Sequence, residues 1–242
     1  MLFKRTASER LKVVELRGLI YAVGDIHGRL DLLLQALRRI KDHAAGRPSQ
    51  IVTLGDYVDR GPDSRGVVEH LIEAQQAGGV ICLKGNHEQM MVEAVRDRGA
   101  ALSRWLDNGG LPALSSYGAA HPGDVDLVPQ KHIDWMASLP VLARDGRRVY
   151  VHAGVAPGRP LERQREHTCL WIREAFLQAA AGDLPGHVVH GHTPVWANKQ
   201  EPSAPELLPH RTNLDTGAFF TDVLAVGVFD SEAPGGPLEI LT

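Results

Sequence analysis

Short apolar runs alternate with segments of helical periodicity through the first third of the chain. The runs at 19–24, 50–55 and 79–85 each end in glycine and are typical of buried strands. Between them, residues 29–44 and 64–76 repeat branched aliphatic side chains at helical spacing. Strand, helix, strand, helix, strand is the order of parallel βαβ units, so the pattern predicts an α/β fold.

The pattern is less regular in the rest of the chain. Residues 97–135 indicate short helices around the Asn-Gly-Gly sequence at 108–110. The later elements are expected as strands 141–145 and 147–154 in a hairpin, helix 170–180, strand 187–191, a surface loop at 198–210, and strands 211–217 and 222–230. No repeat or low-complexity tract divides the sequence, and we expect a single domain over residues 1–242.

Composition narrows the class of protein. The 242 residues are 43% hydrophobic and 23% charged, as in ordinary soluble globular proteins. A net charge of -3 offers no basic excess for nucleic acid or an anionic membrane, so we expect neither as a partner. The N-terminal segment lacks the apolar stretch of a secretory signal. Cys82 and Cys169 form no CxxC motif, which favours core positions and a cytoplasmic location.

Polar and ionisable side chains follow the predicted strands. In chain order they are Asp25 and His27, then Asp56, Asp59 and Arg60, then Asn86 and His87, then His152, and finally His190 and His192. Ligands of open α/β sheets bind beyond the carboxyl ends of the strands, so we expect these groups at one rim. Carboxylates, imidazoles and an amide oxygen suit Mn, Fe or Zn, and they are numerous enough for more than one ion.

Each motif alone also has a structural explanation. Gly-Asn-His-Glu at 85–88, for example, is what a turn followed by a helix cap looks like. Asp and Gly after a strand make ordinary turns as well. The five motifs together, in this order, favour a metal site over five unrelated turns.

The motifs carry a resemblance to a known family. Gly-Asp-Ile-His-Gly (24–28), Gly-Asp-Tyr-Val-Asp-Arg-Gly (55–61) and Gly-Asn-His-Glu (85–88) resemble the phosphoprotein phosphatases of the calcineurin-like metallophosphoesterases. His-Ala-Gly (152–154) and Gly-His-Thr-Pro (191–194) are similar to the later metal-ligand motifs, with Ala153 where eukaryotic members usually have glycine. "GNHEQMM" and "WLDNGG" resemble the bacterial and phage serine/threonine phosphatase branch. The resemblance implies two mixed β-sheets packed face to face and flanked by helices.

The resemblance also implies roles for individual residues. It gives Asp25 and His27 to a first metal, Asp56 to both metals, and Asn86, His152 and His192 to a second. Two divalent ions, expected to be Mn with Fe or Zn as alternatives, share a hydroxide that attacks phosphorus in line. His87 is the implied general acid for the leaving alkoxide, and Asp59 is the charge partner that keeps it protonated.

Four further residues are assigned as well, three of them against an alternative. Arg60 and Arg173 match phosphate-binding arginines of the family, and we assign both to the substrate, although a solvated position on an amphipathic helix is the alternative for Arg173. Glu88 is either an acid favoured by the helix dipole or a support for the site. We take His190 as a strand or supporting residue rather than a further metal ligand, and we expect the four tryptophans to be packing residues.

Three functions compete. The first is a metal-dependent phosphomonoesterase of the serine/threonine protein phosphatase type, acting on phosphoproteins or small phosphomonoesters. The second is a diadenosine tetraphosphatase-type nucleotide hydrolase, favoured by "HAGVAP" at 152–157 but with no evident adenine site. The third is an inactive scaffold that keeps the fold, which the complete ligand set disfavours. The intact pair of Asp59 and His87 favours the first, because an alkoxide needs a proton to leave.

Overall fold

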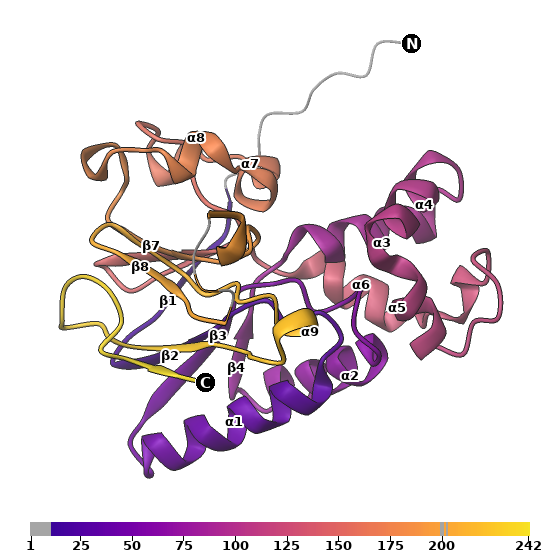
Figure 1. The fold of residues 1–242 in the computed structure, drawn as a ribbon, viewed down its shortest axis with the longest axis horizontal. Coiled ribbons are helices and arrows are strands. Elements are labelled where there is room, and N and C mark those ends of the chain that lie inside the picture. The colour runs from indigo at the N-terminus through magenta and orange to yellow at the C-terminus, as the bar shows by residue number, and fades with distance from the viewer. Residues whose placement is uncertain (1–10, 199–200, 202) are drawn as a thin grey trace.

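Two β-sheets pack face to face, with helices on their outer faces. The computed structural model describes residues 11–198, 201 and 203–242, and Figure 1 shows the layers. One sheet has the order β11 (Glu239–Leu241), β10 (Val226–Asp230), β2 (Leu19–Val23), β3 (Ser49–Thr53) and β4 (Val80–Cys82). The other has the order β1 (Val13–Glu15), β5 (Leu142–Arg144), β6 (Arg148–Val151), β7 (His187–His190), β9 (Arg211–Asn213) and β8 (Glu206–Leu208). The predicted fold class is confirmed.

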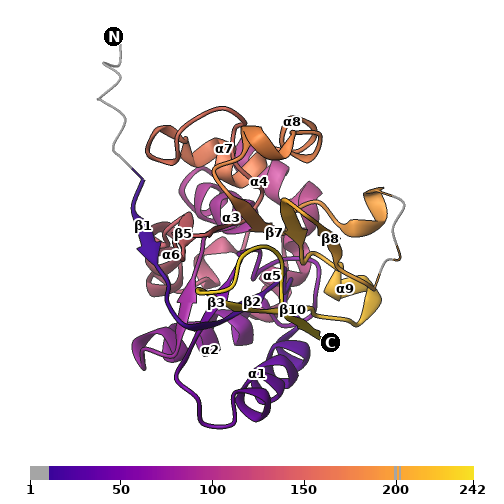
Figure 2. The same ribbon diagram turned by 90° about the vertical axis from the view of Figure 1, so that its left-hand side faces the viewer.

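The helices cover both outer faces of this sandwich. They are α1 (Leu30–Ala44), α2 (Ser64–Gln76), α3 (Asn86–Arg96), α4 (Ala100–Trp105), α5 (Leu111–Ser116), α6 (Gln130–Ser138), α7 (Glu166–Trp171), α8 (Glu174–Leu177) and α9 (Ala218–Thr221). Figures 1 and 2 show α1 and α2 on the side of β2 to β4, and α7 and α8 on the side of β7. No helix among the described residues is long and apolar enough to span a membrane.

Side chains that point alternately to the two faces of each sheet divide the core into layers. Ile20 and Ala22 of β2 pack between the sheets, in the cluster that contains Tyr150 and Val189. Their neighbours along the strand, such as Tyr21, join the cluster beneath the helices. Because successive strand residues face opposite sides, β2 is buried on both faces and reads as a continuous apolar run. This double burial fixes the strand register, and with it the loops at the strand ends.

Most predicted elements are confirmed, and two are wrong. The expected helix at 170–180 is broken, because Ile172 is extended and Arg173 lies in a turn between α7 and α8. The expected loop at 198–210 contains strand β8, which pairs antiparallel with β9. A buried ion pair between Glu206 and Arg211 joins those two strands. The rest of that loop includes residues outside the described part of the chain. Strands β1 and β11 were not anticipated.

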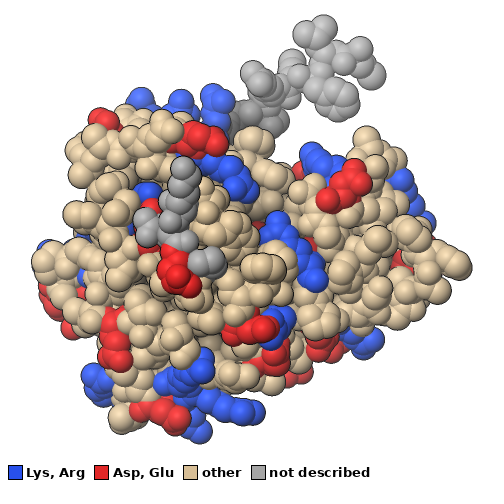
Figure 3. All heavy atoms as spheres, viewed as in Figure 1, with Lys and Arg blue, Asp and Glu red and all other residues tan. Residues whose placement is uncertain are grey.

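Charged side chains are interspersed over the face of the molecule drawn in Figure 3. Acidic and basic groups alternate there, without gathering into a patch of one sign.

The predicted ligand loops follow β2, β3 and β4 of one sheet and β6 and β7 of the other. Our expectation of a single rim is therefore incomplete, because the loops of two sheets converge. His152 joins the sheets, with its Nδ1 atom 3.0 Å from the carbonyl oxygen of Leu54.

Candidate dimetal phosphoesterase site

The loop after β3 is held by a buried carboxylate. Glu88, in the first turn of α3, is fully buried and accepts hydrogen bonds from four backbone N–H groups. One oxygen binds Asp56 N at 2.9 Å and Gly85 N at 2.8 Å, and the other binds Tyr57 N at 2.7 Å and Val58 N at 3.3 Å. Glu88 therefore supports the site, and it is also a first-turn acid that accepts the N–H of Gly85 at the start of α3, so both sequence-based explanations apply.

Glycine is required where these segments meet. A Cβ atom on Gly85 would lie 2.2 Å from Asp56 Oδ1, and one on Gly191 would lie 1.9 Å from Asp25 Oδ1. Both distances are far shorter than any real contact, so the backbone must approach these carboxylates without a side chain in between. The loops after β4 and β7 are thereby packed directly against two predicted metal ligands.

Asp56 lies between two groups of predicted ligands. Its Oδ2 atom is 3.5 Å from His27 Nε2, and its Oδ1 atom is 3.3 Å from His152 Nε2. Asn86 Oδ1 lies 2.8 Å from both His152 Nε2 and His192 Nδ1. Two sets of potential ligand atoms thus share Asp56, one with His27 and His87 and the other with His152 and His192.

Asp25 completes the group of buried carboxylates. Its Oδ2 atom accepts the backbone N–H of His192 at 3.0 Å, while Oδ1 has no hydrogen-bond partner. Burial, followed by the neighbouring Asp215 and Asp56 carboxylates, raises the pKa of Asp25 well above its usual range. A cation beside Asp25 would relieve both the repulsion and the missing partner.

Burial favours the neutral form of three predicted histidine ligands. Burial lowers the pKa of His27 and of His152, and burial together with His152 lowers the pKa of His192 to about 2. Neutral imidazoles offer a lone pair to a metal ion. His192 Nε2 is also buried without a partner. Buried carboxylates, neutral imidazoles and an amide oxygen fit a pair of divalent cations.

His87 and Asp59 form the predicted pair. His87 Nδ1 donates to Asp59 Oδ2 at 2.6 Å, and both side chains are buried. His87 Nε2 faces the cluster of predicted metal ligands around Asp56, 3.8 Å from Asp56 Oδ2. The indole N–H of Trp105 donates to both oxygens of Asp59, a contact that the sequence analysis missed. Nothing in the local sequence of Trp105 signals it, because 46 positions separate the two residues.

Two arginines lie beside the cluster. Arg60 Nη1 is 2.8 Å from His27 Nε2, and Nη2 is 3.1 Å from His87 Nε2. Arg173 is exposed, and its Nη1 reaches Thr193 Oγ1, next to His192, at 3.4 Å. The helix break described above is what carries Arg173 there. His190 is the last residue of β7 and packs edge-on against Phe176, as expected for a strand residue.

Backbone strain is concentrated in these loops. Non-glycine residues with positive φ include the predicted site residues His27 (46°), Asp56 (52°), Asp59 (74°), Arg60 (68°) and His192 (66°). Such residues cost roughly 1–3 kcal/mol each and persist where the surroundings over-determine them.

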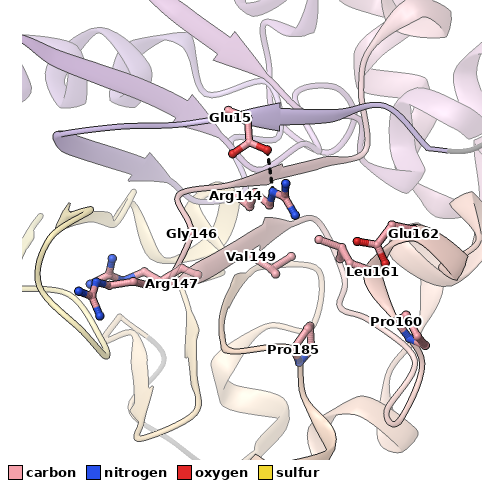
Figure 4. A pocket seen from close by; sticks show the side chains of 10 residues that line it. Glu15, Arg144, Gly146, Arg147, Val149, Pro160, Leu161, Glu162 and Pro185 are labelled. Carbon is pink, nitrogen blue, oxygen red and sulfur yellow. Dashed lines mark hydrogen bonds and ion pairs between the residues drawn. The ribbon is translucent and has the colours of Figure 1, made fainter.

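A surface cavity of about 340 Å³, shown in Figure 4, is lined by none of the predicted site residues. It lies at the opposite end of β6 from His152 and includes the ion pair of Glu15 with Arg144.

The class of protein that this geometry defines is a metal-dependent phosphoesterase, a hydrolase. The chain belongs to the calcineurin-like phosphoesterase family, which matches residues 18–221. It is 33% identical over 185 residues to "Serine/threonine-protein phosphatase 1" of Salmonella typhimurium, covering 73% of this chain and 79% of that protein. The resemblance seen in the sequence motifs is thereby confirmed.

Other relatives have a different named activity. The chain is 31% identical over 139 residues to a symmetrical bis(5'-nucleosyl)-tetraphosphatase of Neisseria meningitidis, covering 57% of this chain and 44% of that protein. It is also similar to a solved structure described as a putative diadenosine tetraphosphatase, with a TM-score of 0.67 and 24% identity. That match covers 96% of this chain and 97% of the other, and it supports the fold alone.

Asp56→Asn should remove activity and weaken binding of both metals. The reason is that Asp56, alone among the described residues, belongs to both groups of potential ligands, through different oxygens. Elemental analysis of Mn²⁺-loaded protein gives the stoichiometry, with Asp222→Asn as a control at an exposed position of similar backbone conformation. Two tightly held ions in active Asp56→Asn protein would exclude the bridging position.

Glu88→Gln should lower stability and metal content together. Each Glu88 oxygen accepts two N–H groups, so an amide NH₂ in either orientation faces two donors. The expected loss is about 1–3 kcal/mol of unfolding free energy, measured by urea titration of metal-free protein. The matched control is Glu93→Gln on the same helix, where the partner is the exposed Arg104. Equal effects of the two substitutions would argue against this role for Glu88.

Proposed function

We propose that the protein is a metal-dependent phosphomonoesterase of the serine/threonine protein phosphatase type. The buried pair of His87 and Asp59 carries this proposal, with 2.6 Å between Nδ1 and Oδ2. Burial lowers the pKa of His87, but the carboxylates of Asp56 and Asp59 outweigh it and raise the pKa overall. A protonated imidazole facing the cluster can give its Nε2 proton to a leaving alkoxide. The similarity to a named serine/threonine phosphatase supports the same choice.

The metal ligands belong to this proposal. Asp25, His27, Asp56, Asn86, His152 and His192 would hold two divalent ions, for which Mn is our first choice. When bound, two such ions supply positive charge for the phosphoryl oxygens and activate water. The chain itself orients the ligands, since Glu88 holds the Asp56 loop and Leu54 holds His152.

Arg60 and Arg173 are proposed to bind the phosphoryl group. Arg60 reaches both His27 and His87, so its guanidinium lies within reach of a phosphate placed there. A planar guanidinium can donate to two phosphoryl oxygens at once. Arg173 would approach from the side of His192. A cytoplasmic location is also part of the proposal, and the two buried free cysteines fit a reducing compartment.

His87→Asn should lower kcat by roughly 10²–10⁴ for alkyl phosphates, as for a lost general acid. Metal content should stay near that of the wild type, because Asn86 and Asp56 remain. The loss should shrink with nitrophenyl phosphate, whose leaving group needs no proton. Asp59→Asn should resemble His87→Asn rather than Asp56→Asn. A loss of the same size for alkyl and nitrophenyl phosphates would remove His87 from the acid role.

A second candidate, hydrolysis of dinucleoside polyphosphates, is favoured by an aromatic surface. Phe219 lies edge-on to His27 at 5.6 Å and beneath the Arg60 guanidinium at 5.1 Å. The next residue, Phe220, is 73% exposed and packs against Trp196 at 5.9 Å. Exposed rings beside a phosphate-binding arginine can stack a nucleobase. The sequence analysis found no such aromatic group, because residues 196 and 219–220 are far apart in the chain.

The two candidates are separated by substrate preference. We expect a higher kcat/KM for a phosphothreonine peptide than for diadenosine tetraphosphate, using one Mn²⁺-loaded preparation. Phe220→Ala should leave peptide hydrolysis unchanged, and it should weaken dinucleotide hydrolysis only if the rings stack a base. Leu238→Ala, which removes another exposed apolar side chain, is the control. A preference for the dinucleotide by about tenfold or more would promote the second candidate.

A further inference from the structure

Trp105 occupies an unusual position behind the His87–Asp59 pair. Its side chain is fully buried at the end of α4, and its Nε1 atom lies 2.8 Å from Asp59 Oδ1 and 2.9 Å from Oδ2. An indole N–H can only donate, so it favours an acceptor carboxylate over a protonated one. The opposite partner of the same carboxylate is the imidazole of His87.

The surrounding backbone leaves Asp59 little other freedom. Ser64 Oγ binds its backbone N–H at 2.9 Å, and its φ of 74° places the residue in the left-handed region. After Trp105 the chain turns at Leu106–Gly110 with a kink at Gly109 (φ 100°), whose carbonyl accepts the N–H of Arg60 at 3.0 Å. A Cβ on Gly110 would lie 2.7 Å from the indole ring. The turn that holds Arg60 is thus packed directly on Trp105.

Other described tryptophans are bonded differently. Trp135 Nε1 donates to Gln75 at 2.7 Å, and Trp171 Nε1 donates to Gln89 at 2.8 Å. Both acceptors are neutral amides. A hydrogen bond to a charged group is stronger than one between neutral groups. Of these three tryptophans, only Trp105 donates its indole N–H to a carboxylate, that of Asp59, which has a proposed part in the reaction.

We propose that Trp105 is a positioning residue for proton transfer. It fixes the orientation of the Asp59 carboxylate, which in turn orients the His87 ring so that Nε2 faces the leaving group. The inference rests on the proposed role of His87 as the acid. Trp105 touches neither the substrate nor the metal ligands in this scheme, so its effect passes through Asp59.

Trp105→Phe keeps an aromatic ring and removes the donor. We expect kcat for an alkyl phosphate to fall about tenfold, as for one lost hydrogen bond to a charged group. KM and metal content should change little, and the loss should nearly vanish with nitrophenyl phosphate. Trp135→Phe, which also removes an indole hydrogen bond, should leave kcat unchanged for both substrates. In the Asp59→Asn background, Trp105→Phe should add almost no further loss.

A spectroscopic measurement tests the contact without turnover. The His87 Nδ1 proton should give a downfield NMR resonance in the metal-free protein, assigned by its absence in His87→Asn. We expect Trp105→Phe to shift or broaden it and Trp135→Phe to leave it in place. If Trp105→Phe does not fold, a benzothienylalanine at position 105 keeps the shape of the indole and lacks the N–H.

Two results would overturn the inference. One is an unchanged kcat and an unchanged resonance in Trp105→Phe. The other is a loss of equal size for alkyl and nitrophenyl phosphates, which would assign Trp105 to packing alone. If the wild-type protein hydrolyses no phosphate ester, the proposed function fails, while the NMR comparison still decides whether Trp105 orients the pair.

Discussion

The geometry of the site depends on one buried carboxylate, that of Glu88. Its two oxygens bind the backbone of Asp56, Tyr57 and Val58 and that of Gly85. Burial and the neighbouring Asp56 carboxylate raise the pKa of Glu88 to about 7, which means that both disfavour its charged form. Four N–H donors offset part of that penalty. Because Glu88 belongs to α3, it couples the loop after β3 to the helix that begins with Asn86 and His87.

The strained backbone conformations of the site occur directly after buried strands. His27, Asp56 and His192 adopt left-handed backbone conformations that favour glycine, and they do so at the ends of strands buried on both faces. The doubly covered strands hold the loop ends in register. The hydrogen bonds of the loops then stabilise left-handed backbone conformations that are unfavourable for these residues in isolation. The result is a set of buried carboxylates and neutral imidazoles. A pair of cations would relieve the repulsion between the carboxylates and would supply partners for the atoms that lack a hydrogen bond.

Much of this arrangement could be predicted from the sequence. The βαβ periodicity predicts β2, β3 and β4, and the residues after each of these strands are those that converge. The pairing of His87 with Asp59 came from the family resemblance, and the structure brings the two side chains to 2.6 Å. The assignment of metals, acid and phosphate-binding arginines stays a prediction, as does the single domain.

The remainder depended on contacts between distant segments. The sequence around Glu88 indicates a first-turn helix acid. Its N–H donors Asp56 and Tyr57, however, lie 32 and 31 positions earlier, in a loop whose path no local pattern reveals. Trp105 and Asp59 are 46 positions apart, and the amphipathic pattern at 170–180 conceals the break at Arg173. The Phe219–Phe220–Trp196 surface likewise forms only when α9 packs beside the site.

Anomalous diffraction from crystals grown with Mn²⁺ and phosphate tests the central claim most directly. If the loops held by Glu88 form one dimetal site, two peaks should appear roughly 3.5–4 Å apart, both beside the Asp56 carboxylate. One should adjoin Asp25 and His27, and the other Asn86, His152 and His192. A single peak, or two peaks that do not share Asp56, would contradict the account.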